Sequence, residues 1–576
     1  MSRRIAFALL ILPSVFGQTP SEALNILFAD EWAWREKEFL RSGPNHSLTF
    51  DRLPSASPES QQRRLQYWSQ CLSDLNKIPT ATLTRDEKID AATFRTFLEA
   101  EIANLRFKTY EAPFNSDTFF WTSLSPRQPY RSAAEYRNLL GRMKDLPRYF
   151  NEQIANMRSG LARGYSVPYV STVGREKTIE AYTKPGPTNP FFEAFQQIPE
   201  SIPAAEREQL KTQALNLISD SIAPAYLRLL TFFRDEEYQP KTRRSIDAHS
   251  LPDGPAFYRA AIKEYTTLDL SAEEIHQIGL QEVARIRADM EKTIKGSGFQ
   301  GTFPEFLSFL RTDPQFYAKT PRELLSYVSY IVKRVDGQLK NFFLILPRYR
   351  HGIIKVPDAI APIYTSGRGG LDNCLFNTYD LPSRPLYNLP ALTVHECTPG
   401  HSFQAALALE APQRPEFRRH TYFSSYGEGW GLYTEWLGTK MGIYETPYEE
   451  FGRQTFEMWR AARLVIDTGI HAKGWSRQQA IDYLSSNTAL AKLDIENEID
   501  RYIAWPAQAL SYKLGELKIR EMRALAEKEL GPQFDQRPFH DLILNLGSVP
   551  LPVLESEIRA YIAAKKLTTS SSQAVH

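Results

Sequence analysis

Apolar residues recur at intervals of three and four along most of the chain, the spacing typical of amphipathic helices. Ser132 followed by Glu135, and Ser271 followed by Glu274, are capping signatures that mark helix starts. The pattern is helical over residues 23–40, 63–75, 85–107, 132–163, 204–233, 271–295 and almost throughout 401–566. We therefore predict a mostly α fold.

Two stretches interrupt this rhythm. Residues 112–130 are rich in Pro and aromatic residues and predict a long surface loop. Residues 353–379 contain β-branched and aromatic residues split by Gly367 to Gly370, which predicts a small β-sheet just before residue 389. Within it, Phe376 to Tyr379 is a candidate edge strand that pairs with an extended peptide, or else plain structural β. Asn377 is thus a candidate substrate contact.

A polar, Pro-containing link at residues 239–255 suggests the main division of the chain. It gives an N-terminal helical region, 18–250, and a C-terminal region with the small sheet, 251–566. Residues 567–576 are polar and predict a disordered tail. With 576 residues, 42% of them hydrophobic, the chain can bury a large core.

The first 17 residues have the pattern of a signal peptide. Arg3 and Arg4 precede an apolar run from Ile5 to Phe16, and Gly17 is small enough for a cleavage site. The run is too short for the ~20 residues of a spanning helix, and no Cys lies near the cleavage point to take a lipid. We expect export to the periplasm or the outside, with no stable membrane insertion afterwards.

The charge balance and the cysteine content exclude two classes of protein, those that bind nucleic acid and those held together by disulfides. Lys and Arg total 69 against 67 Asp and Glu, a balance that gives no electrostatic case for nucleic acid as a partner. The chain has three cysteines, Cys71, Cys374 and Cys397, too few for a disulfide scaffold, so we expect no cross-links to hold the fold. Cys397 is alternatively a soft metal ligand.

The segment from Leu392 to Gln404 carries the chemistry. His395 followed by Glu396, with His401 after it, is the combination of a hydrolytic zinc site. Six residues separate the imidazoles instead of the usual four, which on an unbroken helix places them about 240° apart. Pro399 and Gly400 predict an interruption that returns His401 to His395. The alternative is a helix that ends at Thr398 with two unrelated His.

A catalytic zinc ion has three protein ligands, so a third is expected downstream. Glu428 and Glu435 are two helical turns apart and share a face. Glycines at 427, 429 and 431 cost about 1 kcal/mol each in a helix interior, which indicates a close approach to another element. We assign Glu428 as ligand and Glu435 as the residue that orients a ligand imidazole. The alternative is a solvated acidic face.

Two further stretches supply polar candidates. Arg460, Arg463, Asp467 and His471 form one stripe on an apolar helix. His471 is a candidate oxyanion donor with its tautomer fixed by Asp467, or else both belong to a structural network with Arg463. Downstream, candidates to stabilise an oxyanion or clamp a peptide carboxylate are Arg501, Tyr502, Gln508 and Tyr512.

The chain resembles a bacterial family filed under a domain of unknown function, number 885, whose members look like zinc metallopeptidases. The resemblance covers nearly the whole mature chain. It rests on His395-Glu396-x-x-Pro399-Gly400-His401-x-x-Gln404, Glu428-Gly429-Trp430 with Tyr433 and Glu435, Asp467 to His471, Arg501-Tyr502 with Pro506, Gln508 and Tyr512-Lys513-x-Gly515, and Phe539-His540-Asp541 with Gly547-x-Val549-Pro550.

That resemblance implies a fold similar to thimet oligopeptidase and carboxypeptidase Taq: a large multi-helix bowl whose deep channel surrounds the metal. Those relatives also place a second Glu seven residues after the ligand Glu, in agreement with Glu428 and Glu435. They use the compact H-E-x-x-H motif, whereas members of the 885 family share the longer spacing found here.

We expect an exported zinc-dependent peptidase for oligopeptides with one zinc ion, held by His395, His401 and Glu428, and Glu396 as general base. Tyr512 or His471 stabilises the oxyanion. Residues expected to support the ligands are Glu435, Asp467 and Gln404, and those expected to contact the peptide are Arg501, Tyr502, Arg463 and Asn377. The alternatives are a non-catalytic peptide-binding protein and a zinc hydrolase of non-peptide amides or esters. The oligomeric state is left open.

Overall fold

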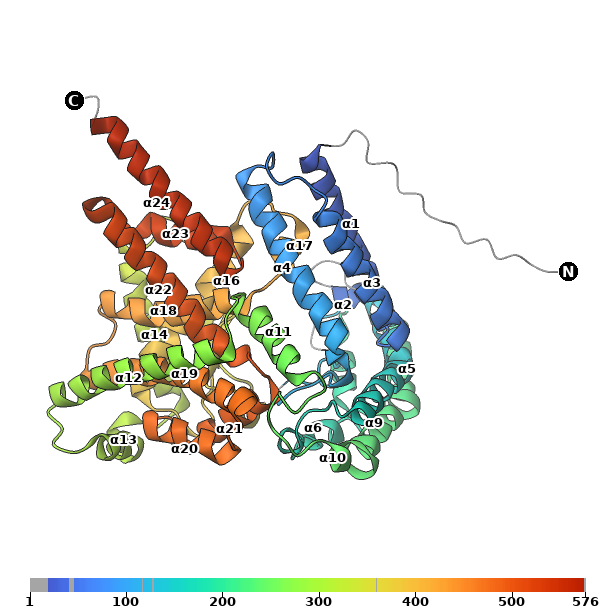
Figure 1. Cartoon of the computed structure of the whole chain (residues 1–576). Coiled ribbons are helices and arrows are strands. Elements are labelled where there is room, and N and C mark those ends of the chain that lie inside the picture. Colours follow the sequence, from blue (N-terminus) through green and yellow to red (C-terminus); the bar gives the residue numbers. More distant parts are fainter. Residues whose placement is uncertain (1–18, 41–45, 117, 127–128, 359, 574–576) are drawn as a thin grey trace.

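The computed structural model describes residues 19–40, 46–116, 118–126, 129–358 and 360–573 (Figure 1). The predicted signal peptide lies outside these residues. The mostly α fold is confirmed, because helices make up most of the described chain. The first ten helices are α1 (Pro20–Phe39), α2 (His46–Thr49), α3 (Pro58–Leu75), α4 (Arg85–Phe107), α5 (Ala133–Arg163), α6 (Lys177–Glu180), α7 (Glu193–Gln196), α8 (Ala204–Leu217), α9 (Ala223–Leu230) and α10 (Tyr238–Lys241).

The predicted capping signatures are confirmed. The Ser132 hydroxyl accepts from the Glu135 N–H at the start of α5, and the Glu135 carboxylate accepts from the Ser132 N–H. Ser271 and Glu274 make the same reciprocal pair at the start of α12. These two bonds satisfy N–H groups that the helix itself leaves without acceptors.

The described residues of the predicted loop at 112–130 form neither a helix nor a strand, as expected, but the predicted surface position is wrong. Trp121 has no exposed surface, and Phe114, Phe119 and Tyr130 are also buried. Their rings pack into one cluster with α5, α8 and α9, and Tyr226 donates a hydrogen bond to the Trp121 carbonyl. The aromatic side chains gain more from burial than an irregular backbone gains from solvent, so the segment becomes part of a core.

The remaining helices form the other part of the molecule, drawn from green to red in Figure 1. The long helix α19 is buried on all sides from Phe451 to His471 and packs along α12, while α18 packs along α22. The last helix runs on to Gln573, beyond the predicted end at Lys566. The bounds are α11 (Gly254–Thr266), α12 (Ala272–Gly296), α13 (Phe303–Thr312), α14 (Pro321–Gln338), α15 (Leu389–Glu396), α16 (His401–Glu410), α17 (Glu416–His420), α18 (Ser424–Lys440), α19 (Pro447–Lys473), α20 (Arg477–Asn487), α21 (Lys492–Ala504), α22 (Ser511–Leu530), α23 (Gln536–Leu546) and α24 (Leu551–Gln573).

A small sheet lies beside α15, as predicted. Its strands are β1 (Gly352–Lys355), β2 (Gly367–Arg368) and β3 (Asn373–Phe376), in the order β1-β3-β2. β3 is parallel to β1 and antiparallel to β2, so it is the central strand. The predicted edge strand at Phe376 is therefore wrong: both sides of β3 are already paired, and the strand nearest the motif helix is β2.

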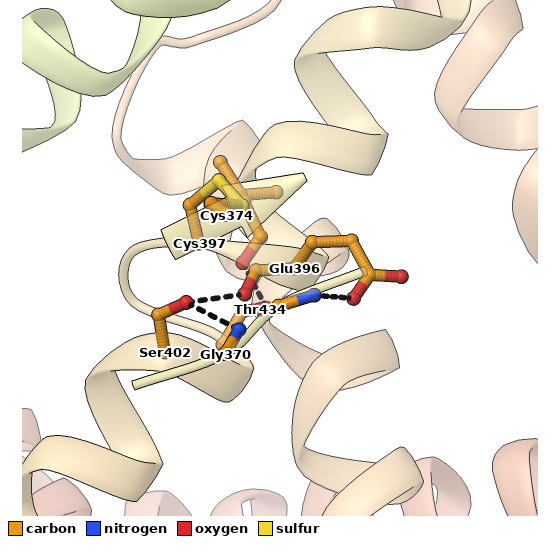
Figure 2. The surroundings of a disulfide bond; sticks show 8 residues. Gly370, Cys374, Glu396, Cys397, Ser402 and Thr434 are labelled. Atoms are coloured by element: carbon orange, nitrogen blue, oxygen red, sulfur yellow. Dashed lines mark hydrogen bonds between the residues drawn. A yellow bond between two sulfur atoms is a disulfide. The ribbon is translucent and has the colours of Figure 1, made fainter. Parts of the chain in front are cut away.

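A disulfide joins β3 to the end of α15, which corrects the expectation that the fold has no cross-links. It links Cys374 to Cys397, and both side chains are fully buried (Figure 2). Because both thiols are consumed, Cys397 is not a metal ligand. Cys71 is free and buried.

Over the described part of the chain, no helix combines the length and apolar character needed to cross a bilayer. The predicted boundary near residue 250 stays a prediction.

Candidate metal centre

The motif helix is interrupted where the sequence predicted it. α15 ends at Glu396, α16 begins at His401, and the Thr398–Pro399 peptide between them is cis. A Cβ on Gly400 would lie 1.8 Å from the His395 carbonyl oxygen, so only glycine fits this close approach. The two imidazole ring centroids come within 4.8 Å of each other.

The helix α18 carries both predicted carboxylates to this point. A Cβ on Gly431 would lie 2.8 Å from the His395 ring, so the absent side chain is what lets α18 approach the imidazole. Trp430 Nε1 donates to the Pro399 carbonyl at 2.9 Å, and Thr434 donates to the Val394 carbonyl at 2.9 Å. These bonds fix α18 against both sides of the interruption.

His395, His401 and Glu428 each direct one ligand atom to a common point. Those three atoms lie within 4.8 Å of one another. Glu428 Oε2 is 3.2 Å from His401 Nε2 and 3.6 Å from His395 Nε2. Two imidazole nitrogens and one carboxylate oxygen are the donor set of a catalytic zinc site, so the residues present fit this ion.

Glu435 orients the first imidazole. Its Oε1 accepts a hydrogen bond from His395 Nδ1 at 2.7 Å, and both side chains are buried. Nε2 is the atom that faces His401 and Glu428, and the bond from Nδ1 to Glu435 makes Nε2 the nitrogen that would lose its proton to a metal ion. The predicted supporting position of Glu435 is therefore what the structure shows.

The charges of the cluster reinforce one another. Burial acts to lower the pKa of His395, but its contacts with Glu428 and Glu435 outweigh burial and raise that pKa to about 9. Burial likewise acts to raise the pKa of Glu428, yet His401 and His395 hold it well below its usual range. Glu428 is thus a carboxylate over the whole neutral range.

Glu396 lies next to this cluster and is held by the sheet. The Gly369 N–H donates to Glu396 Oε2 at 2.6 Å, and a Cβ on Gly369 would lie 2.0 Å from the Glu396 carbonyl oxygen. Ser402 donates to that carbonyl at 3.1 Å and accepts from the Gly370 N–H at 3.2 Å (Figure 2). The glycine run after β2 therefore fixes both ends of Glu396.

One large cavity, of about 980 Å³, opens over these residues. Its walls come from α15, α16, α18, α19, α21, β2 and the start of α22. A second cavity of about 530 Å³ shares the wall residues Thr118, Glu264, Tyr265 and Trp505 with the first. The two cavities are therefore neighbours, and residues of α1, α3 and α4 line the second one.

Two tyrosines face the cluster from opposite elements. Tyr512, predicted as an oxyanion donor, stacks its ring on His395 with the centroids 6.5 Å apart, and its hydroxyl accepts from Arg501 Nη2 at 3.4 Å. Tyr422, which the sequence did not single out, lines the same cavity, and its hydroxyl lies 2.2 Å from where a Cβ on Gly427 would be. The glycine at 427 was the signal that could have found it.

His471 is not part of the site. Its Nδ1 accepts from the Ala248 N–H at 3.0 Å and its Nε2 donates to the Tyr502 carbonyl at 2.9 Å, so both nitrogens are occupied. Burial lowers the pKa of His471 to about 3. The predicted oxyanion role is wrong, because the ring lies on the side of α19 away from the cavity and has no proton to offer there.

Asp467 does not orient His471 either. It accepts from the Tyr258 hydroxyl at 2.6 Å and from the Ala507 N–H, and burial raises its pKa to about 7. It joins α11, α19 and the segment before α22. This position corrects the prediction that Asp467 supports the metal ligands.

Some of the remaining predicted residues line the cavity and others do not. Arg463 and Arg501 line the cavity, whereas Tyr502 is buried behind it and its hydroxyl accepts from Arg463 Nε at 2.8 Å. Asn377 lines the cavity wall, but its amide donates to two carbonyls, those of Ala361 and Tyr364. Gln404 lies outside the cavity wall, on α16. Tyr502 and Asn377 are therefore structural supports.

The chain resembles solved structures of proteins whose function is not known. It is 26% identical to a protein provisionally described as a lipoprotein from Colwellia psychrerythraea, with a TM-score of 0.86 over 95% of this chain and 100% of that one. A second, from Shewanella oneidensis and also provisionally described as a lipoprotein of unknown function, is 18% identical, with a TM-score of 0.69 over 94% of this chain and 99% of that one.

No curated protein matches the chain. One family model does, over residues 41–558, which include the whole cluster and the walls of its cavity. The chain thus belongs to the family described as bacterial protein of unknown function, DUF885.

Proposed function

We propose that this protein is an exported zinc-dependent hydrolase that cleaves oligopeptides. The observation that carries the proposal is the convergence of His395, His401 and Glu428 within 4.8 Å, beside a general-base residue that the Gly369 N–H holds in place. When bound, zinc supplies Lewis acidity, which lowers the pKa of water and polarises a carbonyl.

The chain's own residues supply the rest of the chemistry. Glu396 accepts the proton of the attacking water, since one of its oxygens is fixed by the Gly369 N–H and the other is left for the transfer. Tyr512 donates its hydroxyl proton to the carbonyl oxygen as negative charge develops there. Arg501 supports this role because it donates to the Tyr512 oxygen and leaves the tyrosine proton for the substrate.

Tyr422 is a second donor to the same oxygen. Its hydroxyl lies over α18 at Gly427, the residue before the ligand Glu428. Two hydroxyl donors that converge from different elements are the arrangement that stabilises a tetrahedral oxyanion.

The shape of the cavity supports a peptide substrate. Its volume of about 980 Å³ lies at the upper end of the range for small-molecule sites, and a second cavity shares part of its wall. The backbone of Gly367 to Gly369 forms part of its wall. An extended peptide has the length and the backbone hydrogen-bonding groups to use such a surface.

Export is supported by the similar structures, because both are provisionally described as lipoproteins. The basic and apolar start of the chain agrees with this assignment.

The test combines metal analysis with a peptide-library assay read by mass spectrometry. We expect one zinc ion per chain and cleavage that Glu396→Gln lowers by about 10²- to 10⁴-fold, the usual contribution of a general base. The matched control is Glu208→Gln, on α8, whose side chain is 72% exposed. It removes the same charge far from the cavity and should leave cleavage unchanged.

Two results would contradict the proposal. A purified chain that takes up no divalent metal has no hydrolytic centre of this kind. Stoichiometric zinc with equal cleavage by wild type and Glu396→Gln would show that the activity arises elsewhere.

A further inference from the structure

Arg460 and Arg463 form a buried pair of guanidinium groups on the cavity wall. They are one helical turn apart on α19, with exposed fractions of 4% and 1%. The Arg463 guanidinium carbon lies 4.2 Å from the centroid of the Tyr512 ring, and that ring stacks on His395. One aromatic side chain therefore separates this pair from the metal centre.

The pair has hydrogen-bonding capacity left over. Arg463 donates from Nε to the Tyr502 hydroxyl and from Nη2 to Glu498 at 2.9 Å, whereas its Nη1 is buried without a partner. Arg460 has a buried Nε without a partner, and its nearest carboxylate oxygen, on Glu435, is 3.7 Å away. Buried donors of this kind destabilise a fold unless something binds them.

The carboxylates near this pair are shared with other residues. Arg501 also lines the cavity here, close to Glu498 at 3.8 Å. Of the two carboxylates available, Glu435 is already bonded to His395 and Glu498 is shared between Arg463 and Arg501. Arg460 and Arg463 therefore share their two nearest carboxylates with His395 and Arg501.

We propose that Arg460 and Arg463 bind the C-terminal carboxylate of the substrate, so that the protein removes short pieces from the C-terminus of peptides. This inference rests on the hydrolase function proposed above. A planar carboxylate matches the fork of a guanidinium group, and burial strengthens the pair. Arg460 is also held between the rings of Phe456 and Trp459, with its guanidinium carbon 4.7 and 4.0 Å from their centroids.

The distance to the metal centre sets the length of the product. An extended peptide advances about 3.3–3.6 Å per residue. With only the Tyr512 ring between His395 and Arg463, the carboxylate lies one or two residues beyond the bond that is cut. In that step water adds across the C–N bond: its oxygen joins the carbonyl carbon and its two protons go to the new amine and the new acid. The amine product is a free amino acid or a dipeptide.

The test uses three synthetic peptides that share one sequence taken from the library. The first ends in a free carboxylate, the second in an amide, and the third in an amide with Glu as its last residue. We expect wild type to cleave the free acid at least about 100-fold faster, in kcat/KM, than either amide, and to release one or two C-terminal residues. The third peptide distinguishes a terminal carboxylate from one on an acidic side chain.

Substitutions of Arg460 and Arg463 test whether these residues cause the preference for a free carboxylate. Arg463→Gln should reduce the acid-to-amide ratio to near one, and Arg463→Lys, which keeps the charge but loses the fork, should give an intermediate ratio. Arg460→Gln is a second, independent variant if Arg463→Gln does not fold. The matched control is Arg234→Gln, 41% exposed beside Asp235. Zinc content and melting temperature are measured for each protein.

Equal cleavage of acid and amide by wild type would overturn the inference and leave the hydrolase standing, as would release of long C-terminal pieces. Cleavage of the Glu amide as fast as the acid would also overturn it. If zinc-loaded wild type cleaves no peptide, the hydrolase proposal fails. Fluorescence anisotropy with zinc-loaded Glu396→Gln then decides the carboxylate site alone: tighter binding of the acid than of the amide supports it, and equal binding rejects it.

Discussion

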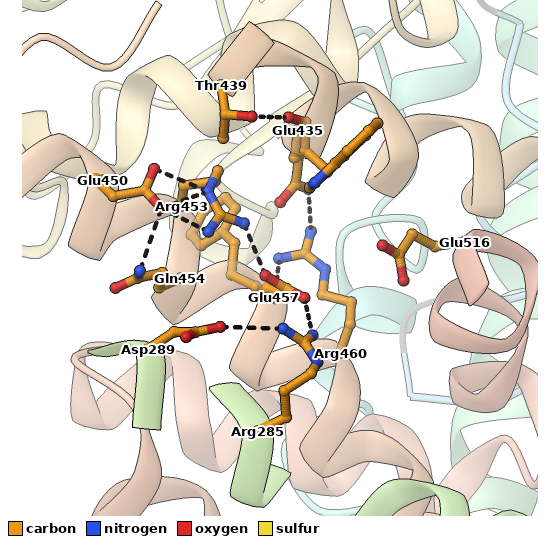
Figure 3. A network of polar contacts seen from close by, with 12 residues as sticks. Arg285, Asp289, Glu435, Thr439, Glu450, Arg453, Gln454, Glu457, Arg460 and Glu516 are labelled. Carbon is orange, nitrogen blue, oxygen red and sulfur yellow. Dashed lines mark hydrogen bonds and ion pairs between the residues drawn. The ribbon is translucent and has the colours of Figure 1, made fainter. Parts of the chain in front are cut away.

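Two buried clusters of charged side chains lie close together in this molecule, and they differ in the groups that surround their glutamate. The first is the metal centre of His395, His401 and Glu428. The second, which we call the ion network, consists of Arg285, Arg453, Glu457 and Lys513, from α12, α19 and α22. Figure 3 shows the first three of these residues. Each cluster holds a glutamate whose pKa neighbouring cations keep well below its usual range.

The difference lies in what surrounds each glutamate. Glu457 accepts from Arg453 at 2.7 Å and from Lys513 at 3.1 Å and also contacts Arg285, and no residue of the network lines the large cavity. Glu428 meets imidazole nitrogens, which hold an ion better than they hold a carboxylate, and it faces the cavity. A displaced pKa alone therefore does not distinguish a functional site from a structural one, whereas an open side and several ligand nitrogens do.

The largest effect is expected in the ion network. Glu457→Gln removes the carboxylate that Arg285, Arg453 and Lys513 share. Each of these cations keeps a second carboxylate partner, so we expect the free energy of unfolding to fall by about 3 kcal/mol, the lower end of the range for a broken buried ion pair. Urea unfolding followed by circular dichroism measures it. Zinc content of the folded fraction should not change. A loss of zinc without a loss of stability would contradict this expectation, because it would show that Glu457 contributes to metal binding.

The converse substitution is Glu428→Gln. It removes one of three ligands, so we expect zinc affinity to fall by more than about 100-fold, the upper limit for residues that only orient ligands. Competition with a chromogenic chelator measures it. Unfolding of the metal-free chain should change less than in Glu457→Gln. Unchanged zinc affinity would show that Glu428 is structural, like Glu457.

A smaller loss of zinc affinity is expected for Glu435, which orients a ligand, than for Glu428, which is a ligand itself. Glu435→Gln keeps a hydrogen-bond acceptor for His395 Nδ1 but removes the charge, so zinc affinity should fall about 10- to 100-fold. The same chelator competition applies. A loss as large as that of Glu428→Gln would place Glu435 among the ligands.

The smallest net effect comes from two buried neutral groups whose pH dependences have opposite signs. His471 has its pKa lowered to about 3 by burial, against about 6.5 when unfolded, so the unfolded chain binds the proton first as the pH falls. Its contribution to stability is complete above pH ~6.5 and is lost towards pH ~3, at up to about 1.4 kcal/mol per pH unit. Asp467, with its pKa raised to about 7, has the opposite sign and stabilises the fold as the pH falls from 7 towards 4.

Unfolding measured from pH 7 to pH 4 checks both signs. We expect His471→Asn to flatten the acid-side loss of stability and Asp467→Asn to steepen it. Identical slopes in the two variants would mean that neither group is neutral in the fold.

Much of the fold was readable because its signals are local. The caps at Ser132 and Ser271 and the apolar spacing of the long helices depend on neighbours within a few residues. The strand order could not be predicted from the sequence, because β3 pairs with β1 and β2 through residues that are distant in the sequence. The disulfide was missed for the same reason: nothing local says that Cys374 and Cys397 meet.

The metal centre was predictable because each ligand belongs to a short pattern: the interrupted pair of imidazoles, and two carboxylates seven residues apart among glycines. His471 and Asp467 were misplaced because α19 is buried on every side, so a polar stripe on it does not reveal which part faces the cavity. Tyr422 was missed because it precedes its helix, where no periodicity marks it.

The disulfide also closes a covalent ring. Cys374 and Cys397 are 23 residues apart, and both His395 and Glu396 lie inside the loop they close, with Tyr379, 50% exposed, on its surface. A protease that cuts once within this loop leaves the two halves of the chain joined through sulfur. A cut at Tyr379 leaves His395, His401 and Glu428 on one fragment and Gly369, whose N–H holds Glu396, on the other, so the disulfide keeps Gly369 joined to the fragment that carries the candidate ligands.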